Sequence, residues 1–166
     1  SGVNCHWSVQ GIVQVGRILH SRPIICAAGE MAESLMRGQN DEQGSKLYGS
    51  WPTSIGEPTA CSAACRLEAL GPAIEGLRSV DEPVAHLERI MLRGAQFIIN
   101  EQFREDNAFM LHTPLEAIGG IRRSPSCFAI RMDVNQHAIA ALLNTLLLLR
   151  QRPCLAAALM EANSRG

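Results

Sequence analysis

Helical periodicity that comes in pairs is the feature that most constrains how this chain can fold. Apolar and small side chains recur at three- and four-residue steps along five stretches, at 8–19, 24–36, 59–77, 84–98 and 136–150. Short breaks that contain proline, at 21–23 and 81–83, separate the members of the first two pairs, and Pro153 would start a short sixth helix. Short connections favour antiparallel neighbours, so the sequence predicts three αα-hairpins in series, in one mainly α domain that spans 1–166.

Proline also bears on the third helix, where Pro72 is expected to cause a kink or an end near Leu70. Thr59 is the predicted N-cap of that helix. The fifth helix is expected to start at Gln136, with Asp133 or Asn135 as its cap.

Two long stretches without helical periodicity separate the predicted pairs. Residues 39–58 are rich in glycine, serine, proline and charge, and residues 104–134 contain paired glycines at 119–120. The segments 109–111 and 128–132 are expected to form a short β-hairpin across those glycines. Loops of this length inside a domain are usually functional, and both lead to the N-terminal ends of helices. Unpaired N–H groups make those helix ends the predicted location of a site.

Composition excludes several classes of function. The formal net charge is -1, which provides no electrostatic footprint for nucleic acid, so no nucleic-acid partner is expected. The longest apolar run, 138–149, is too short to span a bilayer, so no transmembrane segment is expected. The chain starts without methionine, which leaves open a processed chain or a fragment of a longer one.

The six cysteines form no CxxC pair and no zinc-finger spacing. We interpret them as buried free thiols, which favours a reducing, cytoplasmic compartment. Zinc ligation by His6, His112 and His137 has no spacing to support it. The sequence alone therefore predicts neither a metal site nor a cofactor.

The densest polar cluster precedes the last long helix and comprises Arg122, Arg123, Arg131, Asp133, Gln136 and His137. Asp133 lies four residues before His137, so the two side chains are expected to meet across the helix start. Since an aspartate that orients a histidine is the usual arrangement for a general acid or base, we predict that His137 and Asp133 are catalytic. The arginines and Gln136 would bind anionic or hydroxyl groups of a ligand. The structural alternative makes Asp133 a helix cap paired with Arg131 and His137 a partly buried helix residue.

Aromatic and acidic residues supply further candidates. Trp51 in the first long loop and Trp7 before the first helix are predicted stacking walls for a ligand. The repeat of hairpins places Cys5, His6 and Trp7 on the same face as Asp133 and His137. The second loop and its flank carry four carboxylates, at Glu101, Glu105, Asp106 and Glu116. Two carboxylates at a fixed distance from each other would support glycoside hydrolysis. The alternative is that they are solvated loop charges.

Four residues of the first loop, Gln43, Gly49, Ser50 and Trp51, resemble the Q-x(2–5)-G-x-W element of squalene–hopene-type cyclases. The run 49–70 is also similar to repeats of the wider α/α-toroid group, which includes terpenoid cyclases, six-hairpin glycosidases and sugar epimerases. The resemblance covers 43–149 and implies a partial α/α-toroid, since three hairpins make half of a closed six-hairpin ring. The element occurs once and the D-x-D-D acid motif is absent, so cyclase activity is not implied.

The resemblance and the polar cluster together imply a carbohydrate- or polyol-active enzyme of the α/α-toroid type. His137 and Asp133 would supply acid–base chemistry, and the arginines would bind the substrate. The alternative is a non-catalytic helical binding or assembly subunit. The expected partners are a small molecule or glycan, and a homo-oligomer or a larger chain is left open.

Overall fold

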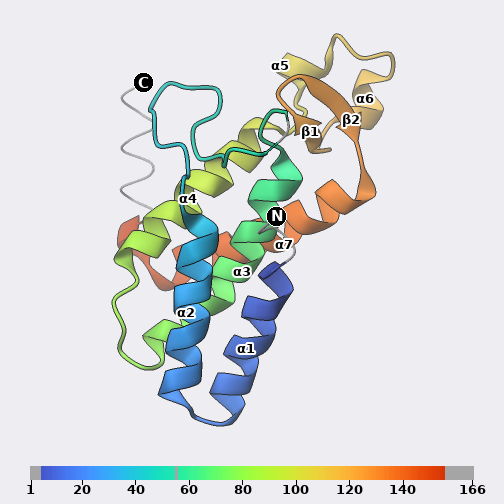
Figure 1. Cartoon of the computed structure of the whole chain (residues 1–166). Coiled ribbons are helices and arrows are strands. Elements are labelled where there is room, and N and C mark those ends of the chain that lie inside the picture. Colours follow the sequence, from blue (N-terminus) through green and yellow to red (C-terminus); the bar gives the residue numbers. More distant parts are fainter. Residues whose placement is uncertain (1–4, 55, 156–166) are drawn as a thin grey trace.

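The computed structural model describes residues 5–54 and 56–155, in which the long helices pack around one central helix (Figure 1). In chain order these helices are α1 (His6–Ile18), α2 (Arg22–Met36), α3 (Ala60–Arg78), α4 (Ala85–Asn100) and α7 (Met132–Gln151). Helix α3 contacts each of the other four. The predicted mainly α fold is confirmed for the described residues, whereas closure of hairpins into a toroid stays a prediction.

Helix α3 is central because apolar and small side chains are buried along its whole length, from Ala60 to Leu77. Thr59 caps it as predicted, since its hydroxyl oxygen accepts a hydrogen bond from the backbone N–H of Ser62. Of the two outcomes expected at Pro72, an end near Leu70 is wrong, because the helix continues to Arg78. Burial of the flanking side chains offsets the one backbone hydrogen bond that proline removes.

The first long loop is packed against the helices. Trp51 in this loop is only 1% exposed, and its indole Nε1 donates a hydrogen bond of 2.9 Å to the carbonyl oxygen of Met36. The guanidinium of Arg66 lies 5.4 Å from the centre of its ring. The prediction that Trp51 forms a stacking wall is therefore wrong: the indole fills the core, where it anchors the loop to α2 and α3.

The second long stretch folds into a small region at one end of the molecule (Figure 1). It contains α5 (Glu105–Ala108), α6 (Pro114–Ala117), β1 (Arg122–Ser124) and β2 (Cys127–Ile130). The strands pair antiparallel, with Arg122 opposite Ile130 and Ser124 opposite Cys127. The predicted hairpin strand at 128–130 is confirmed, but its predicted partner, 109–111, is wrong, because β2 pairs with β1. A turn of two residues between Ser124 and Cys127 closes a shorter loop, which costs less conformational entropy.

Helix α7 starts at Met132, four residues before the predicted position, and neither Asp133 nor Asn135 is its N-cap residue. Several large apolar side chains on its outer surface are exposed, at Ile139, Leu143, Leu146 and Leu147. No helix within the described part of the chain is both long and apolar enough to cross a membrane. The short helix predicted after Pro153 lies largely outside the described residues.

Candidate functional site

The imidazole of His137 faces a carboxylate on α3. Its Nδ1 lies 2.6 Å from the Oε2 of Glu68, and both side chains are largely buried, with 14% and 13% of their surfaces exposed. Glu68 therefore takes the orienting role that the sequence suggested for Asp133. Helices α3 and α7 pack closely along their lengths, and this contact brings the two residues together although they lie 69 positions apart.

His6, at the start of α1, completes this group from the other side. Its Nε2 lies 3.7 Å from the same Glu68 oxygen, and its ring meets the ring of His137 edge-on with centroids 5.5 Å apart. The expectation that residues 5–7 share a face with His137 is met for His6. Cys65, one turn before Glu68 on α3, joins them, and one ligand atom from each of the four residues lies within 4.8 Å of the others. We call His6, Cys65, Glu68 and His137 the helix-junction cluster.

Sequence reasoning missed Cys65 and Glu68 as site residues. A signal is present in the spacing of Cys61, Cys65 and Glu68, which places three polar, reactive side chains on one face of an otherwise apolar helix. The thiols of Cys61 and Cys65 share a hydrogen bond. That bond lowers the pKa of Cys61 to about 7, and together with burial it raises the pKa of Cys65.

Asp133 lies apart from this cluster in its contacts. Its carboxylate accepts two hydrogen bonds from the guanidinium of Arg131, at 3.0 and 2.9 Å, and both residues are exposed. The hydrogen bonds from Arg131 lower the pKa of Asp133. The predicted Asp133–His137 pair is therefore corrected: Asp133 turns to the residue two positions before it, because a bidentate arginine contact is available there.

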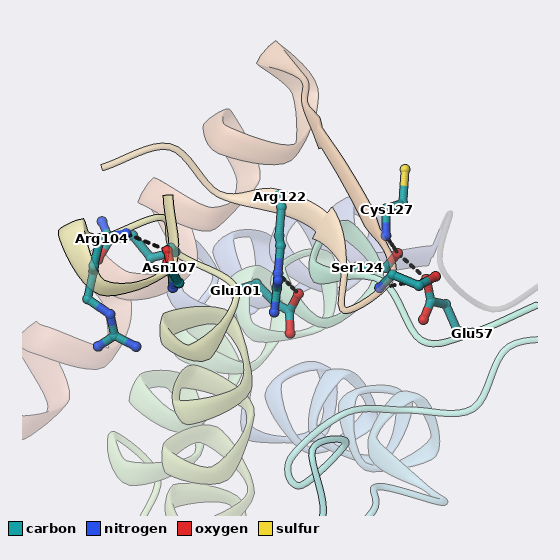
Figure 2. Close-up of polar contacts among 9 residues, drawn as sticks. Glu57, Glu101, Arg104, Asn107, Arg122, Ser124 and Cys127 are labelled. Atoms are coloured by element: carbon teal, nitrogen blue, oxygen red, sulfur yellow. Dashed lines mark hydrogen bonds and ion pairs between the residues drawn. The ribbon is translucent and has the colours of Figure 1, made fainter. Parts of the chain in front are cut away.

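A second polar group lies where the β-hairpin meets the end of α4. The Nε of Arg122 donates a hydrogen bond of 2.8 Å to the Oε2 of Glu101, whose side chain is 2% exposed. Burial raises the pKa of Glu101, and the hydrogen bond from Arg122 opposes that rise. The guanidinium of Arg122 also lies 5.5 Å from the centre of the Phe128 ring. Arg122 thus contacts both the carboxylate of Glu101 (Figure 2) and the aromatic ring of Phe128.

Glu57, from the first long loop, approaches the same hairpin from its turn. Its Oε1 accepts hydrogen bonds from the hydroxyls of Ser124 and Ser126 and from the backbone N–H of Ser126. The hydroxyl of Ser124 in turn accepts from the N–H of Cys127 (Figure 2). The hydrogen bonds from Ser124 and Ser126 lower the pKa of Glu57. No local pattern in the sequence points to Glu57, because its partners lie 67 and 69 residues away.

Two adjoining hollows open around these carboxylates. The larger, of about 620 Å³, is lined by Lys46, Asn100, Glu101, Arg104, Arg122, Pro125 and Ser126. The smaller, of about 420 Å³, is lined by Gly56, Glu57, Thr59, Arg123, Ser124, Ser126 and Cys127. Ser126 belongs to both, so Glu101 and Glu57 line neighbouring spaces on the two sides of one turn. We call the two hollows together the hairpin cleft.

Backbone and side-chain hydrogen bonds hold the hairpin in place. The N–H of Arg122 donates to the carbonyl of Glu101 at 3.0 Å, which ties β1 to the end of α4. Asn135 on α7 accepts from the N–H of Ile121 at 2.9 Å and donates to the carbonyl of Arg131 at 2.8 Å. These bonds tie the hairpin side of the cleft to α4 and α7, whereas Glu57 and Lys46 reach the cleft from the first long loop.

The remaining predicted ligand-binding residues are dispersed. Arg123 lines the smaller hollow of the hairpin cleft, whereas Arg131 pairs with Asp133 and Gln136 is exposed. Trp7 is 65% exposed, and its ring lies 4.9 Å from the ring of His6. The arginines predicted to form one cluster thus divide, with Arg122 and Arg123 at the hairpin cleft and Arg131 at the start of α7.

Comparison of this chain with family models, with curated proteins and with solved structures gives no match. The helix-junction cluster and the hairpin cleft are therefore the features from which a function can be inferred.

Proposed function

We propose that the protein binds a polyhydroxylated, carbohydrate-like substrate in the hairpin cleft and hydrolyses it with Glu101 as general acid and Glu57 as general base. One observation carries this proposal: carboxylates from two distant segments line adjoining hollows on the two sides of the same turn, at Ser126. The proposal keeps the class of reaction that the sequence implied and moves its acid–base residues from α7 to the hairpin cleft, at the end of α4 and in the first long loop.

The lining of the larger hollow supports a hydroxylated ligand. Apart from Pro125, every residue that lines it carries a polar or charged side chain. Hydroxyl groups both donate and accept hydrogen bonds, so they suit a wall that combines the cations Lys46 and Arg104 with the amide of Asn100. Its volume of about 620 Å³ lies within the range of roughly 300–1,000 Å³ that is usual for small-molecule sites.

The different surroundings of the two carboxylates support their different roles. Burial favours the protonated form of Glu101, which suits a group that gives its proton to a leaving oxygen. The serine hydrogen bonds favour the ionised form of Glu57, which suits a group that accepts a proton from water. In hydrolysis of a glycosidic bond, the Glu101 proton would move to the departing sugar oxygen while water, losing a proton to Glu57, adds its hydroxyl to the anomeric carbon.

A panel of unactivated disaccharides and oligosaccharides tests the proposal, with release of reducing sugar as the readout, because a sugar leaving group needs the proton that Glu101 would supply. We expect hydrolysis of at least one glycoside by the wild type, and a loss of about 100-fold or more in kcat for Glu101→Gln and Glu57→Gln. Glu33→Gln is the matched control, because Glu33 pairs with His86 on another part of the surface. Hydrolysis that survives in Glu101→Gln would contradict the proposal, as would wild-type protein that neither hydrolyses these glycosides nor binds monosaccharides in saturation-transfer NMR.

A second candidate function, a non-catalytic assembly subunit, is favoured by the exposed apolar side chains of α7. Ile139 is 60% exposed and Leu143 is 55% exposed, although both belong to the same long helix that forms part of the core. Association of two copies through this surface would cover them. Light scattering after size exclusion separates the candidates: a dimer that dissociates in Leu143→Gln supports assembly, and a monomer in the wild type argues against it.

A further inference from the structure

We propose that the helix-junction cluster of His6, Cys65, Glu68 and His137 is a binding site for one zinc ion. This inference is independent of the proposed function, because none of the four residues lines the hairpin cleft. It also revises the expectation from sequence, which found no metal-ligand spacing among the histidines and cysteines.

The donor set matches the chemistry of zinc. Two imidazole nitrogens, one thiolate sulfur and one carboxylate oxygen are the ligand types that Zn²⁺ takes in proteins, usually four at a time. The mixed nitrogen and sulfur donors disfavour magnesium and calcium, which prefer oxygen ligands. With Cys65 as thiolate and Glu68 ionised, two negative charges balance the ion, so the loaded site is neutral. Neutrality matters here because His6 and Cys65 are buried.

The distances allow the four ligand atoms to reach a tetrahedral arrangement after movements of about 1 Å. Metal–ligand bonds of about 2.0–2.3 Å put the ligand atoms of a tetrahedral zinc site roughly 3.3–3.7 Å apart. The 3.7 Å between His6 Nε2 and Glu68 Oε2 must shorten by only about 0.3 Å. The 2.6 Å between Glu68 Oε2 and His137 Nδ1 must lengthen, and the widest separation in the cluster, within 4.8 Å, must shorten by about 1 Å. Rotation of side chains supplies movements of this size.

The scaffold explains how the ligands stay together. Cys65 and Glu68 are three residues apart on α3, so their side chains lie on one face of that helix. His6 comes from the first turn of α1 and His137 from the second turn of α7, and both helices pack on α3. Binding of zinc would displace the thiol proton of Cys65 and the proton shared by His137 and Glu68, and would join the start of α1 to the α3–α7 pair.

Cobalt(II) in place of zinc tests the site directly, because a cobalt–thiolate bond absorbs in the near ultraviolet and tetrahedral cobalt absorbs in the visible. Protein freed of metal with a chelator is titrated with Co²⁺, and Zn²⁺ is then added to displace it. We expect both absorption bands to saturate at one equivalent of cobalt and to disappear with one equivalent of zinc. Absence of the thiolate band in the folded wild type would overturn the proposal, whatever the behaviour of the variants.

Matched variants assign the ligands. Cys65→Ser should abolish the thiolate band, and His137→Gln should weaken cobalt binding by more than the roughly 10- to 100-fold that loss of an outer partner costs. Cys61→Ser, which keeps a hydroxyl beside Cys65, should retain both bands, and His86→Gln, which removes the exposed contact with Glu33, should leave both bands unchanged. A band that persists in Cys65→Ser, or that Cys61→Ser abolishes, would overturn the assignment. Circular dichroism of each variant verifies that it is folded.

Discussion

His137 on α7 and Glu68 on α3 form a 2.6 Å contact between Nδ1 and Oε2 at the junction of the two helices. His86 and Glu33 form a chemically similar contact of 3.1 Å at the surface, where about half of each side chain is exposed. The two pairs differ in burial and in surroundings, since the buried carboxylate of Glu68 also lies 3.7 Å from His6.

His137→Gln should destabilise the metal-free protein by about 1–3 kcal/mol, because it removes the nearer of two histidines that contact the largely buried carboxylate of Glu68. His86→Gln should change the free energy of unfolding by at most about 1 kcal/mol, because an exposed ion pair contributes little. Urea denaturation of both variants in the presence of a chelator measures the difference. Equal losses in the two variants would mean that the junction contact is no stronger than a surface pair.

Trp51→Phe should destabilise the protein by about 1–3 kcal/mol. The substitution leaves the carbonyl oxygen of Met36 without the indole N–H that now donates to it and leaves part of a core site unfilled. Trp7→Phe is the control, because Trp7 is 65% exposed and its replacement should have an effect within about 0.5 kcal/mol. Thermal unfolding followed by circular dichroism reports both changes, and a neutral Trp51→Phe would contradict the structural role of this indole.

Two glycines of the first loop share a left-handed φ but have different surroundings. Gly44 and Gly49 have φ values of 82° and 83°, but a Cβ on Gly49 would lie 1.9 Å from the carbonyl oxygen of Arg93, whereas nothing lies within 4 Å at Gly44. Gly44→Ala should therefore lower the free energy of unfolding by about 1–2 kcal/mol, because alanine disfavours the left-handed backbone at this position. Gly49→Ala should cost clearly more, since the loop must also move away from α4. The midpoints of urea denaturation measure this difference between the two variants. Equal midpoints would contradict the prediction that Gly49→Ala is the more destabilising substitution.

The hairpin should loosen without general unfolding in Asn135→Ala. The side chain of Asn135 accepts from the N–H of Ile121, and its loss leaves that backbone group without its partner from α7. Hydrogen exchange of the Ile121 amide should become faster by about one to two orders of magnitude, which corresponds to the roughly 1–3 kcal/mol of a lost buried hydrogen bond. The amide of Leu67 in α3 serves as the internal reference. A uniform acceleration at both amides would indicate global destabilisation instead.

Local signals in the sequence were sufficient for some elements and not for others. Thr59 was predictable as a helix cap because a cap depends on residues within one turn, and His6 was placed near His137 by the spacing of the helices. Trp51 was misread because a tryptophan in a glycine-rich loop gives no sign of where its indole packs. Glu68 and Glu57 were missed because their partners lie 67–69 residues away, and only the packing of α7 and of the hairpin brings them together.

The proposed acid–base pair is tested most directly by carboxyl carbon NMR of Glu101 and Glu57 across a pH titration, with Glu101→Gln and Glu57→Gln used to assign the two resonances. Burial raises the pKa of Glu101 and serine hydrogen bonds lower that of Glu57, relative to the ordinary value of 4.5. Ionisation of Glu101 is therefore disfavoured by folding and ionisation of Glu57 is favoured by it. We predict that, as pH rises, Glu57 titrates first, below pH 4.5, and Glu101 second, above it. Coincident midpoints, or Glu101 ionising first, would contradict the assignment of acid and base in the hairpin cleft.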